Sequence, residues 1–351
     1  MILAPAIEIA GRRISVDASP YVIAEISANH NGSLETALRL VDAAKAAGAD
    51  AVKLQTYRPD TITLRSDAEQ FRISDGLWAG RTLYDLYEEA HTPWEWHQPL
   101  FAHAERVGIS IFSSPFDDTA IDLLESLGAP AYKIASFEAV DLSLIRRVAR
   151  TGKPVIISTG LADADEIKEA IDAARGDGCS QLAILHCVSA YPASAGYYNL
   201  RTIPDMIRRF GVVTGLSDHT LDNATALASV ALGASIIEKH FTLDRSGGGP
   251  DDSFSLEPSE LEALCRQAGG AWRALGRVDY GLKSGERGNL KFRRSLYVSR
   301  DVRAGEIASP ENVRSVRPGY GLPCKSLNQV MGRTFVRDVP FSTALNWEML
   351  E

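Results

Sequence analysis

The chain has 351 residues, which at about 150 residues per domain predicts two domains. Hydrophobic residues make up 45% of it and charged residues 23%, so the chain can bury a sizeable core and is neither disordered nor collagen-like. With 45 acidic against 37 basic residues, the net charge is −8. Nucleic acids and anionic membranes bind basic surfaces, so this balance argues against both as partners.

The sequence predicts neither a membrane span nor an export signal. No apolar run reaches the roughly 18 residues that indicate a membrane-spanning helix. No basic residue precedes the short apolar stretch at the start of the chain. The four cysteines form no Cys-x-x-Cys pair, which argues against a disulfide framework or a structural zinc site. We therefore expect a protein of the reducing cytoplasm.

Eight short apolar or β-branched runs, most of them followed by a segment of helical periodicity, predict alternating strands and helices. The runs are residues 21–26, 51–55, 110–113, 131–134, 155–158, 181–186, 212–216 and 235–239. A glycine that can end a helix follows each helical segment, at Gly48, Gly108, Gly128, Gly152, Gly176, Gly211, Gly233 and Gly276. Eight such units predict an α/β protein with a (β/α)₈ barrel. The alternative, an open doubly wound sheet, lacks a G-x-G-x-x-G turn after the first strand.

Four segments lie outside this repeat and complete the predicted domain organisation. Residues 1–20 are expected to form a hairpin that closes the floor of the barrel, whose domain spans residues 1–282. Residues 58–91 are a long insertion after the second strand, and we interpret them as a lid or substrate-selecting loop. A polar linker at 283–290 leads to a compact second domain of short strands and turns at 291–351.

Two histidines at successive strand ends suggest a metal site. His219 and His240 lie 21 residues apart, one strand-helix-strand step. Neighbouring strands are about 4.8 Å apart, so both imidazoles can reach one ion. Two neutral nitrogens leave open positions for water and substrate oxygens, which suits a catalytic Mn²⁺ or Mg²⁺ ion. The alternative is a pair of buried structural histidines.

Two lysines inside apolar strands suggest an anion site. A buried ammonium without a partner is costly, so Lys53 and Lys133 should each lie near an anion. Together with nearby strand-end serines they resemble a cradle for a phosphate and a carboxylate; these serines are Ser114, Ser136, Ser158 and Ser217. An internal network with Glu25 or Glu138 is the alternative, and a Schiff-base lysine is a third possibility. Asp251, in the glycine-rich loop after the eighth strand, is positioned to bind substrate hydroxyls.

The strand ends, taken in order, resemble the sialic acid synthase family. The matching segments are residues 23–32 (IAEISANHNG), 53–56 (KLQT), 113–117 (SSPFD), 133–138 (KIASFE), 158–160 (STG), 215–220 (GLSDHT) and 238–242 (EKHFT). In the second domain, residues 317–321 (RPGYG) are similar to the family's antifreeze-like domain, also called a SAF domain. The resemblance covers nearly the whole chain.

The resemblance implies that phosphoenolpyruvate condenses with an acetamido-deoxy sugar and releases phosphate, with a divalent metal ion (Mn²⁺, Mg²⁺ or Co²⁺) as cofactor. The residues implied to bind phosphoenolpyruvate are Lys53, Ser114, Lys133, Ser136, Ser158 and Ser217. Those implied to contact the sugar or the attacking water are Glu25, Gln55, Glu138, Tyr191 and Asp251. The metal ligands would be His219 and His240. Ser189 stands where relatives commonly have asparagine, and it is expected to contact substrate.

The resemblance also implies a partner and a branch of the family. Family members are swapped homodimers, in which Arg317 would reach the barrel of the partner. Three segments, residues 24–35, 75–96 and 133–138, are most similar to the branch that forms pseudaminic acid from 2,4-diacetamido-2,4,6-trideoxy-L-altrose. N-acetylneuraminate or legionaminic acid synthesis is the alternative within the family. Outside it, the alternatives are a Schiff-base sugar aldolase and a non-catalytic binding module.

Overall fold

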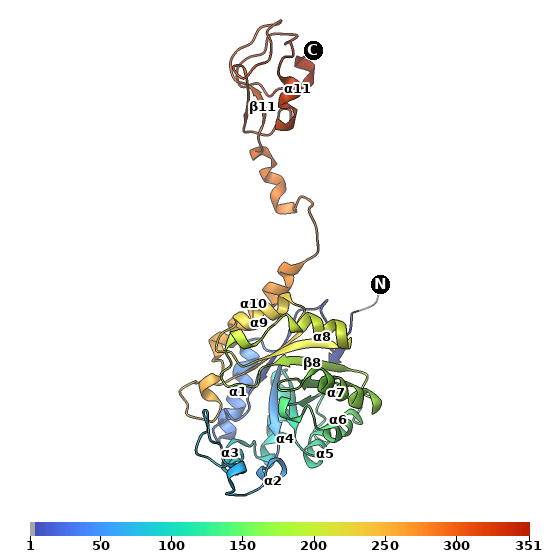
Figure 1. Ribbon diagram of the computed structural model, residues 1–351. Coiled ribbons are helices and arrows are strands. Elements are labelled where there is room, and N and C mark those ends of the chain that lie inside the picture. Colours follow the sequence, from blue (N-terminus) through green and yellow to red (C-terminus); the bar gives the residue numbers. More distant parts are fainter. Residues whose placement is uncertain (1–3) are drawn as a thin grey trace. The chain divides into compact units, whose positions relative to one another are not determined.

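The computed structural model describes residues 4–351, which divide into two compact units between Gly276 and Arg277. The first unit is built on eight parallel strands that close into a barrel in the order β10-β3-β4-β5-β6-β7-β8-β9. Its strands are β3 (Tyr21–Glu25), β4 (Ala51–Thr56), β5 (Ser110–Pro115), β6 (Tyr132–Ile134), β7 (Val155–Ser158), β8 (Leu182–Cys187), β9 (Val213–Asp218) and β10 (Ile236–His240). Each lies on one of the eight predicted runs, so the predicted barrel is confirmed (Figure 1).

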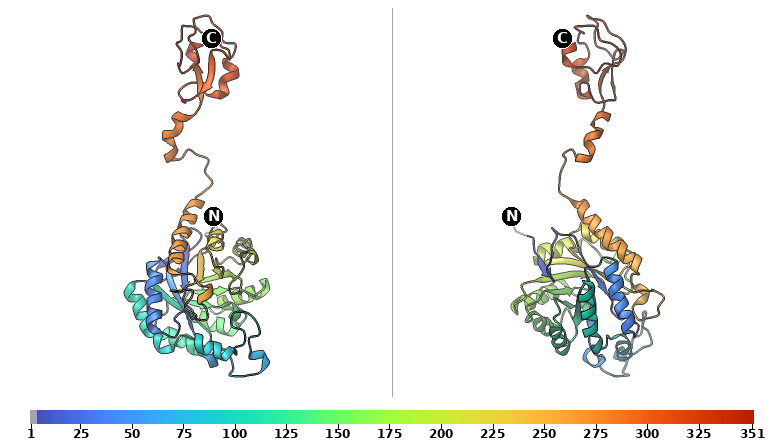
Figure 2. Two further views of the ribbon diagram at one scale, coloured as in Figure 1. Left: turned by 90° about the vertical axis from the view of Figure 1, so that its left-hand side faces the viewer. Right: turned by 180° about the vertical axis from the view of Figure 1, so that it is seen from behind.

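Helices follow the strands and surround them (Figures 1 and 2). They are α1 (Leu34–Ala46), α4 (Trp94–Val107), α5 (Asp118–Ser126), α6 (Leu142–Ala149), α7 (Ala164–Gly176), α8 (Thr202–Phe210), α9 (Ala224–Ala231) and α10 (Pro258–Leu275). Seven of the eight predicted terminating glycines have a positive φ. The expectation for Gly176 is wrong: this glycine is the last residue of α7, and Gly178, with φ of 97°, makes the turn instead.

A hairpin precedes the barrel, as expected for the segment 1–20, whose residues 1–3 lie outside the described residues. Its strands β1 (Ile7–Ile9) and β2 (Arg12–Ile14) pair antiparallel. Ile7, Ile9 and Ile14 pack against side chains at the amino ends of the barrel strands, such as Tyr21 and Ile236. The hairpin therefore closes the floor of the barrel by burying isoleucine side chains.

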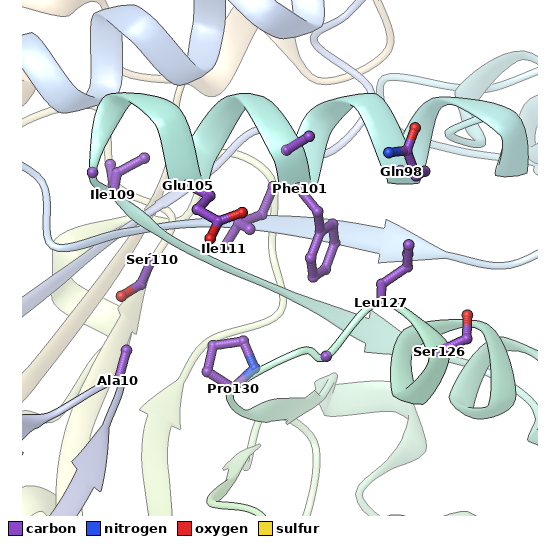
Figure 3. Close-up of a pocket in the computed structure, with 13 residues that line it drawn as sticks. Ala10, Gln98, Phe101, Glu105, Ile109, Ser110, Ile111, Ser126, Leu127 and Pro130 are labelled. Carbon is purple, nitrogen blue, oxygen red and sulfur yellow. The ribbon is translucent and has the colours of Figure 1, made fainter.

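A cavity of about 660 Å³ lies at this amino-terminal end of the strands (Figure 3). Ala10 of the hairpin turn, Phe101 of α4 and Ser110 at the start of β5 contribute to its lining. In (β/α)₈ barrels the chemistry belongs to the opposite, carboxyl end of the strands. The cavity is therefore a feature of the floor and not of the predicted site.

The insertion after β4 carries two short helices, α2 (Pro59–Ile62) and α3 (Leu83–Ala90). Between them the chain turns back on itself. Arg72 bridges Thr82 in antiparallel fashion, and the Gly80 amide donates to the carbonyl of Ile73 (2.8 Å). The tip of the insertion is therefore held by its own backbone hydrogen bonds.

The second unit has an antiparallel pair, β11 (Ser295–Val298) and β12 (Val313–Val316), and one short helix, α11 (Leu327–Val330). Leu296, Val330, Phe335 and Leu345 are fully buried in its own small core. The predicted linker at 283–290 overlaps a 3₁₀ helix at Ser284–Phe292, and residues 277–294 are exposed throughout.

The remaining short 3₁₀ helices are Glu69–Phe71, Ser136–Glu138, Ala195–Tyr197, Asp252–Phe254, Cys324–Ser326 and Trp347–Met349. Among residues 4–351, no helix has the length and apolar character needed to cross a membrane.

Candidate active site

Strand alternation decides which charged side chains face the interior of the barrel. Successive residues of a strand point to opposite faces. On β10, Ile236 packs with the barrel interior, whereas Ile237 packs with the surrounding helices. Glu238 and His240 therefore share the inner face with Ile236, and Lys239 points outward. The same alternation turns Lys53 and Lys133 inward, because their neighbours Val52, Leu54, Tyr132 and Ile134 pack against the helices.

Four buried charged groups meet at the inner face, and we call them the charged cluster (Glu25, Lys53, Lys133 and Glu238). Register pairs Glu25 with Lys53 on neighbouring strands, and the Lys53 Nζ lies 2.5 Å from Glu25 Oε2. Glu238 Oε1 lies between the two lysines, 3.7 Å from Lys53 Nζ and 3.6 Å from Lys133 Nζ. The lysines thus form the internal lysine–glutamate network that was the alternative to an anion cradle, through Glu25 and not through Glu138. Glu238 was missed as a site residue. The signal was present, since Glu238 is a charge within an apolar strand.

Two serines complete the coordination of the lysines. Lys53 Nζ donates to Ser114 Oγ (3.2 Å), and Lys133 Nζ donates to Ser158 Oγ (2.6 Å). Both hydroxyls are buried. The predicted cradle residues Lys53, Lys133, Ser114 and Ser158 are therefore brought together at one end of the barrel.

Burial and mutual contact perturb the charged cluster. Burial raises the pKa of Glu25 to about 7, although Lys53 opposes the shift. Burial also lowers the pKa of Lys133, against the attraction of Glu238. For Lys53 and Glu238, the effect of burial is outweighed by opposite charges, which raise the pKa of Lys53 and lower that of Glu238. With Glu25 partly protonated near neutral pH, Glu238 is the one ionised carboxylate that both lysines face, so an incoming anion would stabilise their charged forms. The cluster is thus suited to receive a further anion.

A second set of small polar groups lies beside Gly160. The Gly160 amide donates to Ser136 Oγ (3.2 Å). A Cβ on Gly160 would clash with Ser189 Oγ and would lie 2.8 Å from Ser136 Oγ. Glycine is therefore required for the two hydroxyls to approach the backbone so closely. Ser189 also lies 4.0 Å from the Cys187 thiol. Ser217 is buried at the end of β9, in register with Glu238 on β10.

Glu138 is a second carboxyl group with a raised pKa. It ends the 3₁₀ helix after β6, and burial raises its pKa to about 7. The nearby Lys133 charge opposes this shift only in part. Glu138 Oε2 is buried and has no hydrogen-bond partner. Glu138 is therefore a carboxyl group that can take up and return a proton near neutral pH.

His219 and His240 lie side by side, with ring centroids 5.4 Å apart, and we call them the histidine pair. His219 Nδ1 lies 2.8 Å from the carbonyl of Val188, so it carries the proton and leaves Nε2 with a free lone pair. His240 Nδ1 is buried without a hydrogen-bond partner, 3.9 Å from Asp251 Oδ2. Burial lowers the pKa of His219 to about 4 and that of His240 well below its ordinary value.

These observations fit a divalent ion held by the histidine pair. Both imidazoles are neutral and each has a nitrogen available as a ligand. The Val188 carbonyl, which accepts from Nδ1, fixes the tautomer of His219. No group of three or more histidine, cysteine or acidic side chains with metal-binding geometry occurs within residues 4–351. An ion at this place would take its remaining ligands from water and substrate oxygens, as the sequence predicts.

The predicted sugar contacts surround the histidine pair. Gln55 Nε2 donates to Glu25 Oε1 (3.0 Å) and so links this region to the charged cluster. Asp251 accepts a hydrogen bond from Ser27, and burial raises its pKa. The Tyr191 ring packs on His219, with centroids 4.4 Å apart. Trp78 and Phe254, which the sequence analysis missed, pack against Tyr191.

Two charged residues lie apart from this constellation. Lys239 Nζ forms an ion pair with Asp218 (3.0 Å) and donates to the carbonyls of Thr220 and Asp222 (both 2.7 Å). Facing away from the barrel interior, Lys239 holds the loop that begins with His219. Arg317 follows β12 in the second unit, and its contact with a partner's barrel stays a prediction.

A closed parallel barrel with the charged cluster and the histidine pair at its carboxyl end, joined to a small β-rich unit, defines a two-domain barrel enzyme. The chain belongs to the NeuB family, whose profile matches residues 40–280. A SAF domain profile matches residues 293–351. The predicted family and the predicted C-terminal domain are therefore both confirmed.

Relatives extend over nearly the full length of the chain. It is 45% identical to the pseudaminic acid synthase of Campylobacter jejuni strain 81-176 over 331 residues, which is 94% of this chain and 96% of the relative. It is 34% identical to the N,N'-diacetyllegionaminic acid synthase of another Campylobacter jejuni strain, over 89% of this chain and 94% of the relative. The crystal structure of N-acetylneuraminic acid synthetase from Leptospira borgpetersenii matches with a TM-score of 0.73 and 30% identity, over 83% of this chain and 96% of that one.

Proposed function

We propose that the protein condenses phosphoenolpyruvate with 2,4-diacetamido-2,4,6-trideoxy-L-altrose to give pseudaminic acid and phosphate. The observation that carries this proposal is the adjacency of the charged cluster and the histidine pair at one barrel mouth. Glu25 of the cluster stands in register with His240 on the neighbouring strand. Gln55 also donates to Glu25 and to Ser27, which in turn donates to Asp251 beside His240. One part is suited to an enol phosphate and the other to a neutral carbonyl sugar. The higher identity to a pseudaminic acid synthase, 45% against 34%, supports this sugar over the legionaminic acid precursor.

Lys53 and Lys133 bind the anionic groups of phosphoenolpyruvate, with Ser114 and Ser158 as fixed hydrogen-bond partners. Ser136, Ser189 and Ser217 offer further hydroxyl groups in the same part of the site. Charged hydrogen bonds in a buried site are strong and directional. When the anion binds, the lysines exchange part of their contact with Glu25 and Glu238 for contact with substrate.

The reaction forms one bond and then breaks another. The methylene carbon of phosphoenolpyruvate attacks the aldehyde carbon of the open-chain sugar and forms the new carbon–carbon bond, while the aldehyde oxygen takes up a proton and becomes a hydroxyl group. Positive charge then develops at the carbon that bears the phosphate oxygen, and water adds there and loses a proton. Collapse of this tetrahedral centre breaks the carbon–oxygen bond and releases phosphate. The two lysines stabilise the negative charge that accumulates on the departing group.

Glu25 and Glu138 are the two groups suited to accept the proton of the attacking water. Burial places the pKa of both at about 7, where a carboxylate can gain and lose a proton readily. Glu25 is held by Lys53 and Gln55, whereas one oxygen of Glu138 is free of hydrogen bonds. Glu138 is therefore the more available base.

The histidine pair would hold the divalent ion. A bound Mn²⁺, Mg²⁺ or Co²⁺ ion supplies Lewis acidity that polarises the aldehyde carbonyl. Tyr191 and Asp251 position the sugar beside it. The half-buried phenol of Tyr191 stays protonated because loss of solvent raises its pKa. A Schiff-base aldolase is disfavoured for Lys53, since the neighbouring carboxylates raise its pKa and keep the amine protonated.

The assay that tests the function measures phosphate release from phosphoenolpyruvate with each candidate sugar in the presence of Mn²⁺. We expect the highest kcat/KM with 2,4-diacetamido-2,4,6-trideoxy-L-altrose. A higher value with N-acetylmannosamine or with the legionaminic acid precursor would assign the chain to that branch instead. Covalent trapping of a carbonyl sugar by borohydride would support the aldolase.

We also propose a cytoplasmic homodimer. All four cysteines are free thiols, which fits a reducing compartment. Within the exposed segment 277–294, Val278 is 90% exposed and Tyr280 is fully exposed. Apolar side chains so exposed mark a surface that another chain covers. Light scattering should give a dimer mass for the intact chain and a lower mass for the V278S/Y280S variant, and a monomeric intact chain would contradict the proposal.

A further inference from the structure

Three aromatic side chains from three different loops pack together beside the histidine pair, and we call them the aromatic wall (Trp78, Tyr191 and Phe254). Trp78 and Tyr191 are partly exposed, whereas Phe254 is buried. Trp78 lies in the loop between α2 and α3. Tyr191 follows β8, and Phe254 lies in the 3₁₀ helix after β10. The Trp78 centroid is 5.9 Å from that of Tyr191 and 6.4 Å from that of Phe254, and the latter two are 5.2 Å apart.

The aromatic wall is continuous with the predicted reaction centre. Tyr191 packs against His219 with centroids 4.4 Å apart, and Phe254 packs against His240 at 5.0 Å. Trp78 contacts Tyr191 and Phe254 and thus extends the wall by one ring beyond the histidine pair. A sugar whose aldehyde carbon lies at the histidines would place its far carbons along this extension.

The position of Trp78 is fixed by a hydrogen bond from outside its own loop. Its indole Nε1 donates to the carbonyl of Pro250 (2.9 Å), next to Asp251. The insertion is thereby attached to the loop after β10, 172 residues further along the chain. Because this bond uses the only donor of the indole, the ring offers a substrate only its carbon faces.

We propose that Trp78 is a specificity-determining residue that selects sugars with a methyl-bearing group, such as a 6-deoxy carbon or a distal acetamido group, in place of a hydroxyl. This inference rests on the proposed function. Burying a methyl group against aromatic carbon is favourable, whereas a hydroxyl group there loses its water without gaining a partner. In an apolar pocket, substrates that differ by one methyl or methylene group differ in kcat/KM by about 10- to 200-fold. The insertion at 58–91 thus contributes to substrate selection through one aromatic residue, which refines the interpretation made from the sequence.

The test compares KM values for two sugars and for phosphoenolpyruvate in the full-length protein. In W78A, we expect KM for 2,4-diacetamido-2,4,6-trideoxy-L-altrose to rise about tenfold or more. KM for N-acetylmannosamine, which carries a hydroxyl at carbon 6, should change much less, as should KM for phosphoenolpyruvate. W78F keeps an apolar ring and should give a smaller rise. The control is L77A, which alters a half-exposed neighbour in the same turn and should leave all three values unchanged.

Equal increases for both sugars, or an increase for phosphoenolpyruvate of similar size, would show a structural role for Trp78 and overturn the inference. An unchanged sugar KM in W78A would overturn it as well. Failure of the proposed function is a separate result, because it would appear in the wild-type protein as a preference for another sugar. W78F protects the test against misfolding of W78A, since a fold that tolerates the smaller ring still reports the selectivity ratio.

Discussion

The two sides of the barrel mouth differ in how they are built. The charged cluster comes from side chains within strands β3, β4, β6 and β10, and its members are held by opposite charges. The aromatic wall comes from three loops and is held by ring packing and one hydrogen bond from Trp78. The charged side is suited to the phosphoenolpyruvate that every reaction of this kind shares. The loop side is suited to the sugar, which varies, so a rigid framework carries the common chemistry and loops carry the specificity.

The largest effect is expected where the two sides meet, at the histidine pair. H219A and H240A should each lower metal-stimulated phosphate release by at least about a thousandfold, because each removes a ligand from a site with only two protein nitrogens. Circular dichroism should show an unchanged fold, and calorimetric titration with Mn²⁺ should show lost binding. Full activity in either variant would refute the metal assignment.

The next largest effect is expected from replacing an inward-facing lysine, Lys133, and it should differ from the effect of replacing the outward-facing Lys239. K133M should lower kcat/KM for phosphoenolpyruvate about a hundredfold, since a hydrogen bond to a charged group contributes about 1.5–3 kcal/mol. Its Tm should change little, because Glu238 keeps Lys53 as a partner and the repulsion between the two lysines is lost.

K239M is the matched control for that variant, and the opposite result is expected. Removal of Lys239 leaves the buried Asp218 carboxylate and two carbonyls without their partner. Breaking a buried ion pair costs about 3–5 kcal/mol, or roughly 6–20 °C in Tm for a domain of this size. Thermal melts and steady-state kinetics of both variants test the contrast. A large fall of Tm in K133M together with an unchanged Tm in K239M would contradict the assigned roles of the two lysines.

A pH-dependent effect of intermediate size is expected at Glu138. Burial raises its folded-state pKa from 4.5 to about 7, so its contribution to stability is full below pH 4.5 and is lost as the pH rises through 7. The glutamine side chain of E138Q cannot ionise, so this variant does not lose that stability as the pH rises. The stability of E138Q relative to wild type should therefore increase between pH 4.5 and 7 and then level off. If Glu138 is the base, the rise of wild-type kcat/KM near pH 7 should be absent in E138Q.

Denaturant titrations at several pH values measure the stability difference, and pH–rate profiles measure the catalytic one. Parallel stability curves across the whole range would show that Glu138 is not perturbed. A retained rise of activity near pH 7 in E138Q would transfer the role of base to Glu25.

The smallest effect is expected at Gly160. A methyl group in G160A would displace the hydroxyls of Ser189 and Ser136, both of which can rotate away. We expect KM for phosphoenolpyruvate to rise about tenfold and stability to fall by about 1–3 kcal/mol. G196A, whose added Cβ meets only Ser194 Oγ at 3.8 Å, is the control. Unchanged kinetics in G160A would remove these serines from the substrate site.

The sequence predicted the charged side better than the loop side, for a physical reason. Strand residues alternate strictly between two faces, so Lys53, Lys133 and His240 could be placed at a shared barrel mouth from the repeat alone. Glu238 obeys the same rule and was missed although its signal was equally strong. Trp78 and Phe254 could not be found in this way, because the closure of loops 172 residues apart has no periodicity in the sequence.

The helix ends also include features that the sequence pattern placed correctly and one that it placed wrongly. Glycines predicted most terminations, but α7 continues to Gly176 because Gly178 two residues later supplies the positive φ. The glycine pattern predicted the turn after α7 but placed it two residues too early, because both Gly176 and Gly178 could have ended the helix. Likewise, Lys239 and Lys53 are both lysines within apolar strands and cannot be told apart by their sequence surroundings. Only the structure shows that Lys239 faces outward and anchors a loop, whereas Lys53 faces inward and belongs to the charged cluster.

The most direct test of the account is a crystal structure of the protein with phosphoenolpyruvate and Mn²⁺, using anomalous scattering to locate the ion. We predict an anomalous peak between His219 and His240, together with enol phosphate density in contact with Lys53 and Lys133. An ion bound elsewhere, or an enol phosphate that does not touch either lysine, would contradict it.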